Sequence, residues 1–137
     1  MKITIIGAGY VGLVSAACFA HLGVDVICVD NNPERIKNLQ SFIMPIYEKG
    51  LQELVVQGIN SGKLSFTDDL KTAVHESDII FIAVGTPSRR GDGHADLSYV
   101  YQAAKQIAEN IMGGYKIIVT KSTVPVGTGQ KLSLIHI

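Results

Sequence analysis

The feature that most constrains this chain is an uncharged run near its N-terminus. Residues 3–20 contain no charged side chain, and a run of this length also suits a membrane span or an exported leader. Three glycines interrupt it, and each costs about 1 kcal/mol inside a helix, which disfavours both alternatives. They are Gly7, Gly9 and Gly12. We therefore expect a buried strand over residues 2–6, a glycine turn, and a helix to about residue 21.

Apolar stretches alternate with amphipathic ones along the rest of the chain. We expect further strands over residues 24–29, 64–66, 78–84 and 115–120. We expect helices over residues 33–40, 51–59, 69–75 and 97–112, the last two capped by Asp68 and Asp96. Apolar strands separated by helices indicate a parallel sheet covered on both faces. The predicted fold class is α/β, a Rossmann-type doubly wound parallel sheet that is incomplete, with five of six strands.

Composition narrows the class of protein further. The 137 residues are 47% apolar and 18% charged, which excludes a disordered chain. Twelve basic and twelve acidic residues give no net charge, which argues against a nucleic-acid partner. Cys18 and Cys28 are too few for a disulfide framework, so we expect two small buried thiols in a reducing compartment. The four histidines show no metal-ligand spacing.

The three glycines form a Gly-x-Gly-x-x-Gly motif, and its context gives the match its weight. The motif follows one predicted strand, opens a helix, and precedes a second strand that ends at Asp30, 18 positions beyond Gly12. In dinucleotide-binding proteins the glycine at the position of Gly7 permits the tight turn. The one at Gly9 lets the backbone approach a pyrophosphate, and the one at Gly12 allows close packing of helix on strand. The free N–H groups of the helix N-terminus would hold the phosphates.

Asp30 sets the expected choice of cofactor. Its carboxylate would accept hydrogen bonds from the adenosine ribose and repel a 2′-phosphate, so NAD is favoured over NADP. Two alternatives stay open at this point: a glycine turn without a ligand, and FAD, which flavoproteins bind with the same fingerprint.

Two further loops follow predicted strands and should meet the glycine loop at the carboxyl edge of the sheet. One carries Gly85, Thr86 and Pro87, and the other carries Thr123. Pro87 holds Thr86 extended, which would aim the Thr86 hydroxyl and the Gly85 backbone toward the cofactor. An ordinary turn role for Thr86 remains open.

Five segments in order resemble the UDP-glucose/GDP-mannose dehydrogenase family. They are residues 2–12 (KITIIGAGYVG), 45–51 (PIYEKGL), 82–87 (IAVGTP), 95–97 (ADL) and 121–128 (KSTVPVGT). The resemblance covers residues 1 to about 130 and is more specific than the glycine motif alone. Lys49 departs from it, because the family usually has proline there.

The resemblance implies roles for individual residues. It implies that Val11, Asp30, Thr86 and Thr123 contact NAD, and that Arg35 lies near the adenosine phosphates or ribose. We add Tyr10, inside the glycine motif, to the cofactor-binding residues. Thr123 also matches the family threonine near the reacting centre, as a supporting catalytic residue, with a turn or cap hydroxyl as the alternative.

The same resemblance implies an oxidoreductase that converts the sugar C6 alcohol to a carboxylate with two NAD molecules, through a cysteine thioester. Neither Cys18 nor Cys28 suits that cysteine, because one falls within a helix and the other within a buried strand. We therefore expect this chain to be inactive alone. The expected organisation is an NAD-binding domain over residues 1–131 and a tail of doubtful origin over 132–137, without the substrate-binding and central dimerisation domains.

The wording of the motifs favours UDP-glucose as the substrate of the full-length protein, with GDP-mannose and UDP-N-acetylmannosamine as alternatives. A cytoplasmic homodimer without membrane, nucleic-acid or metal partners is the expected context. A dinucleotide-binding module without catalysis is the alternative from another functional class.

Overall fold

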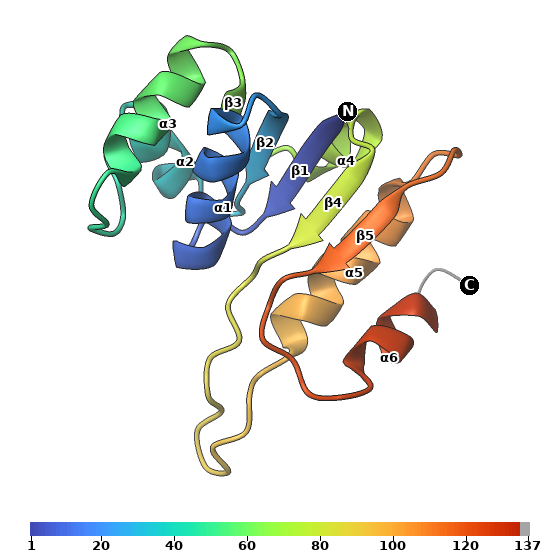
Figure 1. The fold of residues 1–137 in the computed structure, drawn as a ribbon. Helices are drawn as coiled ribbons and strands as arrows, with labels where there is room; N and C mark the ends of the chain where they lie inside the picture. The colour runs from blue at the N-terminus through green and yellow to red at the C-terminus, as the bar shows by residue number, and fades with distance from the viewer. Residues whose placement is uncertain (135–137) are drawn as a thin grey trace.

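The computed structural model describes residues 1–134 and has five strands and six helices in that part of the chain (Figure 1). The strands are β1 (Lys2–Ile6), β2 (Asp25–Val29), β3 (Leu64–Thr67), β4 (Ile79–Ile82) and β5 (Ile117–Thr120). The helices are α1 (Tyr10–His21), α2 (Pro33–Gln40), α3 (Leu51–Asn60), α4 (Leu70–Glu76), α5 (Ser98–Asn110) and α6 (Thr128–Leu134).

The five strands form one parallel sheet in the order β3-β2-β1-β4-β5. The strand β1 pairs with β2 on one side, where Ile3 faces Val26, and with β4 on the other, where Ile3 faces Ile79. Strands are thus added in opposite directions from β1, which leaves a crevice at its carboxyl end. The predicted α/β class and Rossmann-type doubly wound sheet are confirmed.

The two faces of the sheet support separate cores. In β1 the side chains of Ile3 and Ile5 pack with α1, α2 and α3, while Ile6 packs with α4, α5 and α6. This split follows from the two-residue period of a strand, which sends neighbouring side chains to opposite faces. The covered faces explain why most strand positions are apolar.

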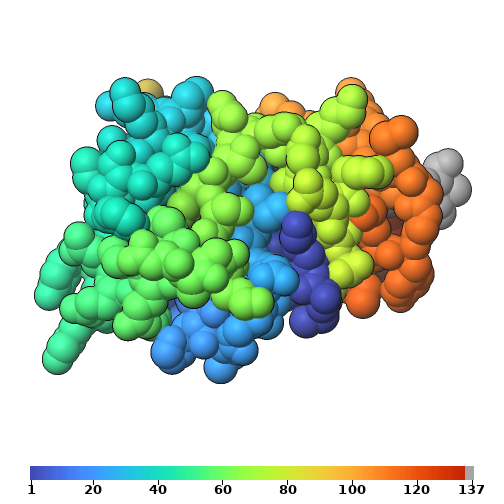
Figure 2. All heavy atoms as spheres, turned by 90° about the horizontal axis from the view of Figure 1, so that it is seen from above, coloured from blue at the N-terminus to red at the C-terminus, as the bar shows by residue number. Residues whose placement is uncertain are grey.

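The amino edge of the sheet brings distant parts of the chain together. Figure 2 looks down on this edge, where the N-terminus lies between the segments before β2 and β4. Lys2 donates its backbone N–H to Asp78 and its Nζ to Glu76, both at 2.9 Å. Inside the fold, the hydroxyl oxygens of Thr4 and Ser77 lie 2.6 Å apart and are both buried.

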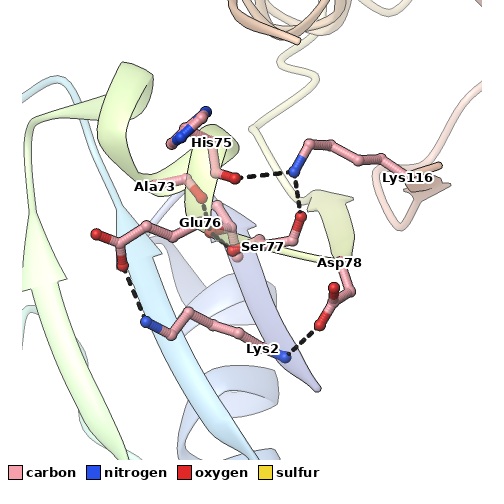
Figure 3. Close-up of polar contacts among 8 residues, drawn as sticks. Lys2, Ala73, His75, Glu76, Ser77, Asp78 and Lys116 are labelled. Atoms are coloured by element: carbon pink, nitrogen blue, oxygen red, sulfur yellow. Dashed lines mark hydrogen bonds and ion pairs between the residues drawn. The ribbon is translucent and has the colours of Figure 1, made fainter. Parts of the chain in front are cut away.

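Lys116 joins the β5 side to this edge, as Figure 3 shows. Its Nζ donates to the carbonyl oxygens of His75 at 3.0 Å and Ser77 at 2.6 Å. These carbonyls end α4 and have no partner within the helix, so a cation there both bonds them and complements the helix dipole. The polar contacts therefore close the edge opposite to the glycine loop.

Three local predictions were wrong. The N-cap of α4 is Asp69 and not Asp68, because the Asp69 carboxylate accepts the Thr72 N–H at 3.1 Å. The N-cap of α5 is Leu97, although the Asp96 carboxylate still accepts the Ser98 N–H at 2.9 Å. Cys18 is exposed, since the buried stripe of α1 runs through Ala16, Ala17 and Ala20 and leaves position 18 on the outer side.

The expected boundary at residue 131 falls inside α6, whose Leu132 is buried against the second core. Residues 135–137 of the expected tail lie outside the described residues. Within residues 1–134, no helix is both long enough and apolar enough to cross a membrane.

Candidate functional site

The turn between β1 and α1 is built so tightly that only glycine fits at two positions. Gly7 has φ +107°, and a Cβ there would lie 2.6 Å from the carbonyl oxygen of Ala83. A Cβ on Gly12 would lie 1.7 Å from the carbonyl oxygen of Gly7. The helix therefore starts directly on its own preceding turn, and that turn lies against the backbone that follows β4.

The N-terminus of α1 has no cap from its own sequence. Its N-cap is Gly9, no side chain accepts the first N–H groups, and the first turn has no acidic residue. A Cβ on Gly9 would meet no atom within 4 Å, so the space in front of it is open. Unpaired N–H groups and the positive end of the helix dipole favour an anion at this position, and they fit the pyrophosphate of a dinucleotide.

Asp30, which follows β2, is a buried carboxylate with three donors. Its side chain is 8% exposed. The Oδ2 atom accepts from the N–H of Ala8 at 2.9 Å and from Nη1 of Arg35 at 3.1 Å. The Oδ1 atom accepts from the N–H of Asn32 at 2.9 Å. A carboxylate accepts about four hydrogen bonds, so one acceptor position of Asp30 remains for a ligand.

A cavity of about 800 Å³ lies at the carboxyl edge of the sheet. Seven residues named from the sequence line it: Gly7, Gly9, Asp30, Arg35, Gly85, Thr86 and Pro87. They come from the segments after β1, β2 and β4, and Arg35 comes from the first turn of α2. The cavity lies within the usual size range of cofactor sites, about 300–1,000 Å³.

Four other residues named from the sequence lie outside the lining of this cavity. Tyr10 and Val11 are exposed in the first turn of α1, next to Gly9, and Gly12 is buried beneath the turn. Thr123 is exposed on the segment after β5. Its neighbour Ser122 holds that segment to the loop after β4 by donating its hydroxyl to the carbonyl of Val84 at 2.8 Å.

The wall formed by α4 and α5 was not expected. It contributes Asp68, Leu70, Tyr99, Gln102, Ala103 and Gln106, while Asn31 adds to the β2 side. The α5 residues follow the three- and four-residue spacing of one helix face. The spacing was present in the sequence, but a stripe with polar members is also what a solvent-facing side of a helix shows, so periodicity alone did not mark it as a ligand wall.

Neither cysteine belongs to the cavity. Cys28 is buried in β2, and burial, with the nearby charge of Asp30, raises the pKa of its thiol to about 12. A thiol with this pKa stays protonated near neutral pH and is a poor nucleophile. Among residues 1–134, no group of three or more metal-ligating side chains comes together.

Comparison with known proteins gives one family over nearly the whole chain. The NAD-binding domain model of the UDP-glucose/GDP-mannose dehydrogenase family matches residues 1–136. A UDP-glucose 6-dehydrogenase of Rhizobium meliloti is 63% identical over 135 residues, which are 98% of this chain and 31% of that protein. The UDP-glucose 6-dehydrogenase TuaD of Bacillus subtilis is 53% identical over 94% of this chain and 28% of that protein.

Solved structures agree with this family. A GDP-mannose dehydrogenase from Pseudomonas aeruginosa aligns with a TM-score of 0.94 at 40% identity, over 98% of this chain and 32% of that one. A UDP-glucose dehydrogenase from Pyrobaculum islandicum aligns with a TM-score of 0.90 at 39% identity, over 98% and 33%. The chain thus spans about a third of the length of the proteins it matches.

Proposed function

The chain belongs to the UDP-glucose/GDP-mannose dehydrogenase family as its NAD-binding domain, and from that premise we propose how its residues hold NAD. Gly9, at the uncapped N-terminus of α1, and the buried Asp30 line the same cavity. The observation that carries the proposal is this pairing of an anion site with a single free carboxylate acceptor. A dinucleotide has both complements, a pyrophosphate and a ribose hydroxyl.

In the proposed complex, the backbone of Gly9 and the first turn of α1, with Tyr10 and Val11, face the pyrophosphate. Asp30 accepts one ribose hydroxyl, because three of its acceptor positions are already filled. Arg35 stays paired with Asp30 and presents the rest of its guanidinium to the cavity. NAD is preferred to NADP, since a 2′-phosphate would meet the Asp30 carboxylate.

The residues after β4 and β5 take the other end of NAD. We propose that Gly85, Thr86 and Pro87 line the path toward the nicotinamide, and that Thr123 supports the reacting centre from the next loop. Ser122 fixes the Thr123 segment through its hydrogen bond to Val84. NAD bound there supplies a hydride acceptor.

For the whole protein we propose oxidation of UDP-glucose to UDP-glucuronate. Conversion of an alcohol to a carboxylate removes two hydrides and adds one water, which requires two NAD molecules in succession. The nucleophilic cysteine then comes from a part of the protein outside this chain, as does a homodimer interface. The 63% identity to a UDP-glucose 6-dehydrogenase favours UDP-glucose, and the 0.94 TM-score to a GDP-mannose dehydrogenase keeps GDP-mannose as the second candidate. Free thiols at Cys18 and Cys28 are consistent with a cytoplasmic location.

Calorimetry with the 137-residue chain tests the proposal. We expect NAD to bind, NADP to bind more weakly, and Asp30→Asn to weaken NAD binding about ten-fold or more. Asp25→Asn is the matched control, because Asp25 lies at the other end of β2 and forms an exposed ion pair with Lys63 at 3.0 Å. Equal NAD binding by wild type and Asp30→Asn would disprove the ribose assignment. Steady NADH formation from UDP-glucose by this chain would disprove the assignment of the nucleophile elsewhere.

A further inference from the structure

The segment of residues 41–50, between α2 and α3, has an irregular backbone with a left-handed residue near each end. Phe42 has φ +64°, the one positive value at a non-glycine residue among residues 1–134, and Gly50 has φ +83° at the N-cap of α3. A non-glycine residue in this region costs about 1 kcal/mol or more, so surrounding contacts must hold it. Met44 and Ile46 supply part of that support by packing on the core beside α1.

The far half of the segment is joined to α1 by one side-chain hydrogen bond. The Tyr10 hydroxyl donates to Oε2 of Glu48 at 2.8 Å. Within residues 1–134 this is the one side-chain hydrogen bond between the 41–50 segment and α1. The bond and the charge of Glu48 also raise the pKa of Tyr10 above its ordinary value of 10.0.

Both ends of the segment reach residues that belong to the proposed NAD site. Tyr10 follows Gly9 directly, at the helix N-terminus assigned to the pyrophosphate. At the other end, Ile43, Met44 and Pro45 line a second cavity of about 200 Å³. Arg35 lines this cavity and the large one, so it forms part of the wall between them.

We propose that the Tyr10–Glu48 hydrogen bond holds residues 41–50 against the first turn of α1, beside the dinucleotide site, and that this contact responds to NAD. Tyr10 and Glu48 are positioning residues in this role: the bond holds the segment against the first turn of α1 while the pyrophosphate occupies that turn. The inference rests on the proposed NAD site and deepens it, by assigning a function to Glu48 and to the segment that carries it.

Two readouts test the inference on the 137-residue chain. The first is the dissociation constant for NAD, which we expect to rise about five-fold in Tyr10→Phe and in Glu48→Leu, and no further in the double variant. Glu48→Gln keeps an oxygen acceptor and is expected to stay close to wild type. The second readout is tryptic cleavage after the exposed Lys49, which saturating NAD should slow in wild type but not in Tyr10→Phe.

The chain offers matched controls for both readouts. Tyr47 is 93% exposed and forms no hydrogen bond within the described residues, so Tyr47→Phe should behave as wild type. Cleavage after Arg90, exposed on the loop after β4, should not depend on the Tyr10–Glu48 bond. If wild type binds NAD but the variants bind it equally well and keep the protection of Lys49, the inference is wrong and the NAD site stands. If wild type does not bind NAD, both are wrong.

Discussion

The N-termini of α1 and α2 follow neighbouring strands at the same edge of the sheet, yet the sequence treats them in opposite ways. At α2 the side chain of Asn32 accepts the N–H groups of Glu34 and Arg35, and Pro33 and Glu34 complete a self-sufficient first turn. At α1 the N-cap is Gly9, without a side-chain acceptor or an acidic neighbour. Of these two helix ends, the one at Gly9 leaves its first N–H groups free for a ligand, and the one at Asn32 does not.

The two helix ends also offer different hydrogen-bonding groups to a ligand. The uncapped end offers donors to an anion, while the capped end carries Arg35 and lies beside the acceptor Asp30. A dinucleotide therefore meets donors at one strand end and an acceptor at the next. Substitutions at these helix ends should therefore affect stability and NAD affinity differently.

The largest effect is expected from Gly12→Ala, because the added methyl group disrupts the packing of the first turn of α1 on the glycine loop. The added Cβ would lie 1.7 Å from the carbonyl oxygen of Gly7, a backbone atom that moves only if α1 shifts. We expect a loss of about 3 kcal/mol or more in urea unfolding, together with loss of NAD binding. Gly9→Ala is the control, since its Cβ meets no atom within 4 Å and the fold should stay within about 1 kcal/mol of wild type. Equal stability of the two variants would contradict the packing argument.

Gly9→Asp should give α1 a side-chain N-cap like the one that Asn32 gives α2. The backbone at Gly9 is already extended, as an N-cap requires, so the new carboxylate would accept the free N–H groups. We expect stability to hold or rise by about 0.5 kcal/mol while NAD affinity falls about 100-fold in calorimetry. A variant that binds NAD like wild type would show that the pyrophosphate lies elsewhere.

Asn32→Ala applies the reverse change to α2. It removes the acceptor of two N–H groups but leaves the backbone N–H of Asn32 bonded to Asp30. We expect a loss of about 1 kcal/mol, seen as a fall of about 4 °C in Tm, with NAD affinity unchanged within about three-fold. A large loss of NAD affinity at unchanged stability would reverse the roles assigned to the two helix ends.

The smallest effect concerns α4, whose N-cap Asp69 adds a third helix end to the contrast. The Thr72 hydroxyl and N–H bond to its carboxylate and hold the pKa of Asp69 below its usual value of 3.8. Because the folded-state pKa is lowered, this contribution is complete above the unfolded pKa and is lost as pH falls through the folded one. Urea unfolding of wild type and Asp69→Asn from about pH 6 to about pH 3 should show their difference shrinking. A difference that grows with acidity would contradict the assigned cap.

The glycine loop and the order of elements were predictable because their causes are local. Gly7 and Gly12 stand where a turn and a close approach exclude any Cβ, and Asp30 ends an apolar run at the expected spacing. The one-residue error at Asp68 came from adjacent aspartates, since either one can begin a helix and only the turn geometry selects Asp69.

The side-chain contacts of the site could not be predicted from neighbouring residues in the sequence. The Arg35 bond that fills an acceptor of Asp30 depends on the side-chain path across the first turn of α2. Tyr10 and Glu48 are 38 residues apart, and neither has a neighbour that indicates the other. Cys18 was predicted buried from its apolar neighbours, although a helix of small residues buries only the stripe that meets the sheet.

The pairing of β1 with β4 sets the order in which the chain acquires its shape during synthesis. Once residue 30 has been made, the glycines and Asp30 are present, but the carbonyl of Ala83 on which Gly7 rests comes about fifty residues later. At about 5–20 residues per second the ribosome needs about 3–10 s for that interval. Until then one edge of β1 has no partner, and an open strand edge is a template for pairing with another chain.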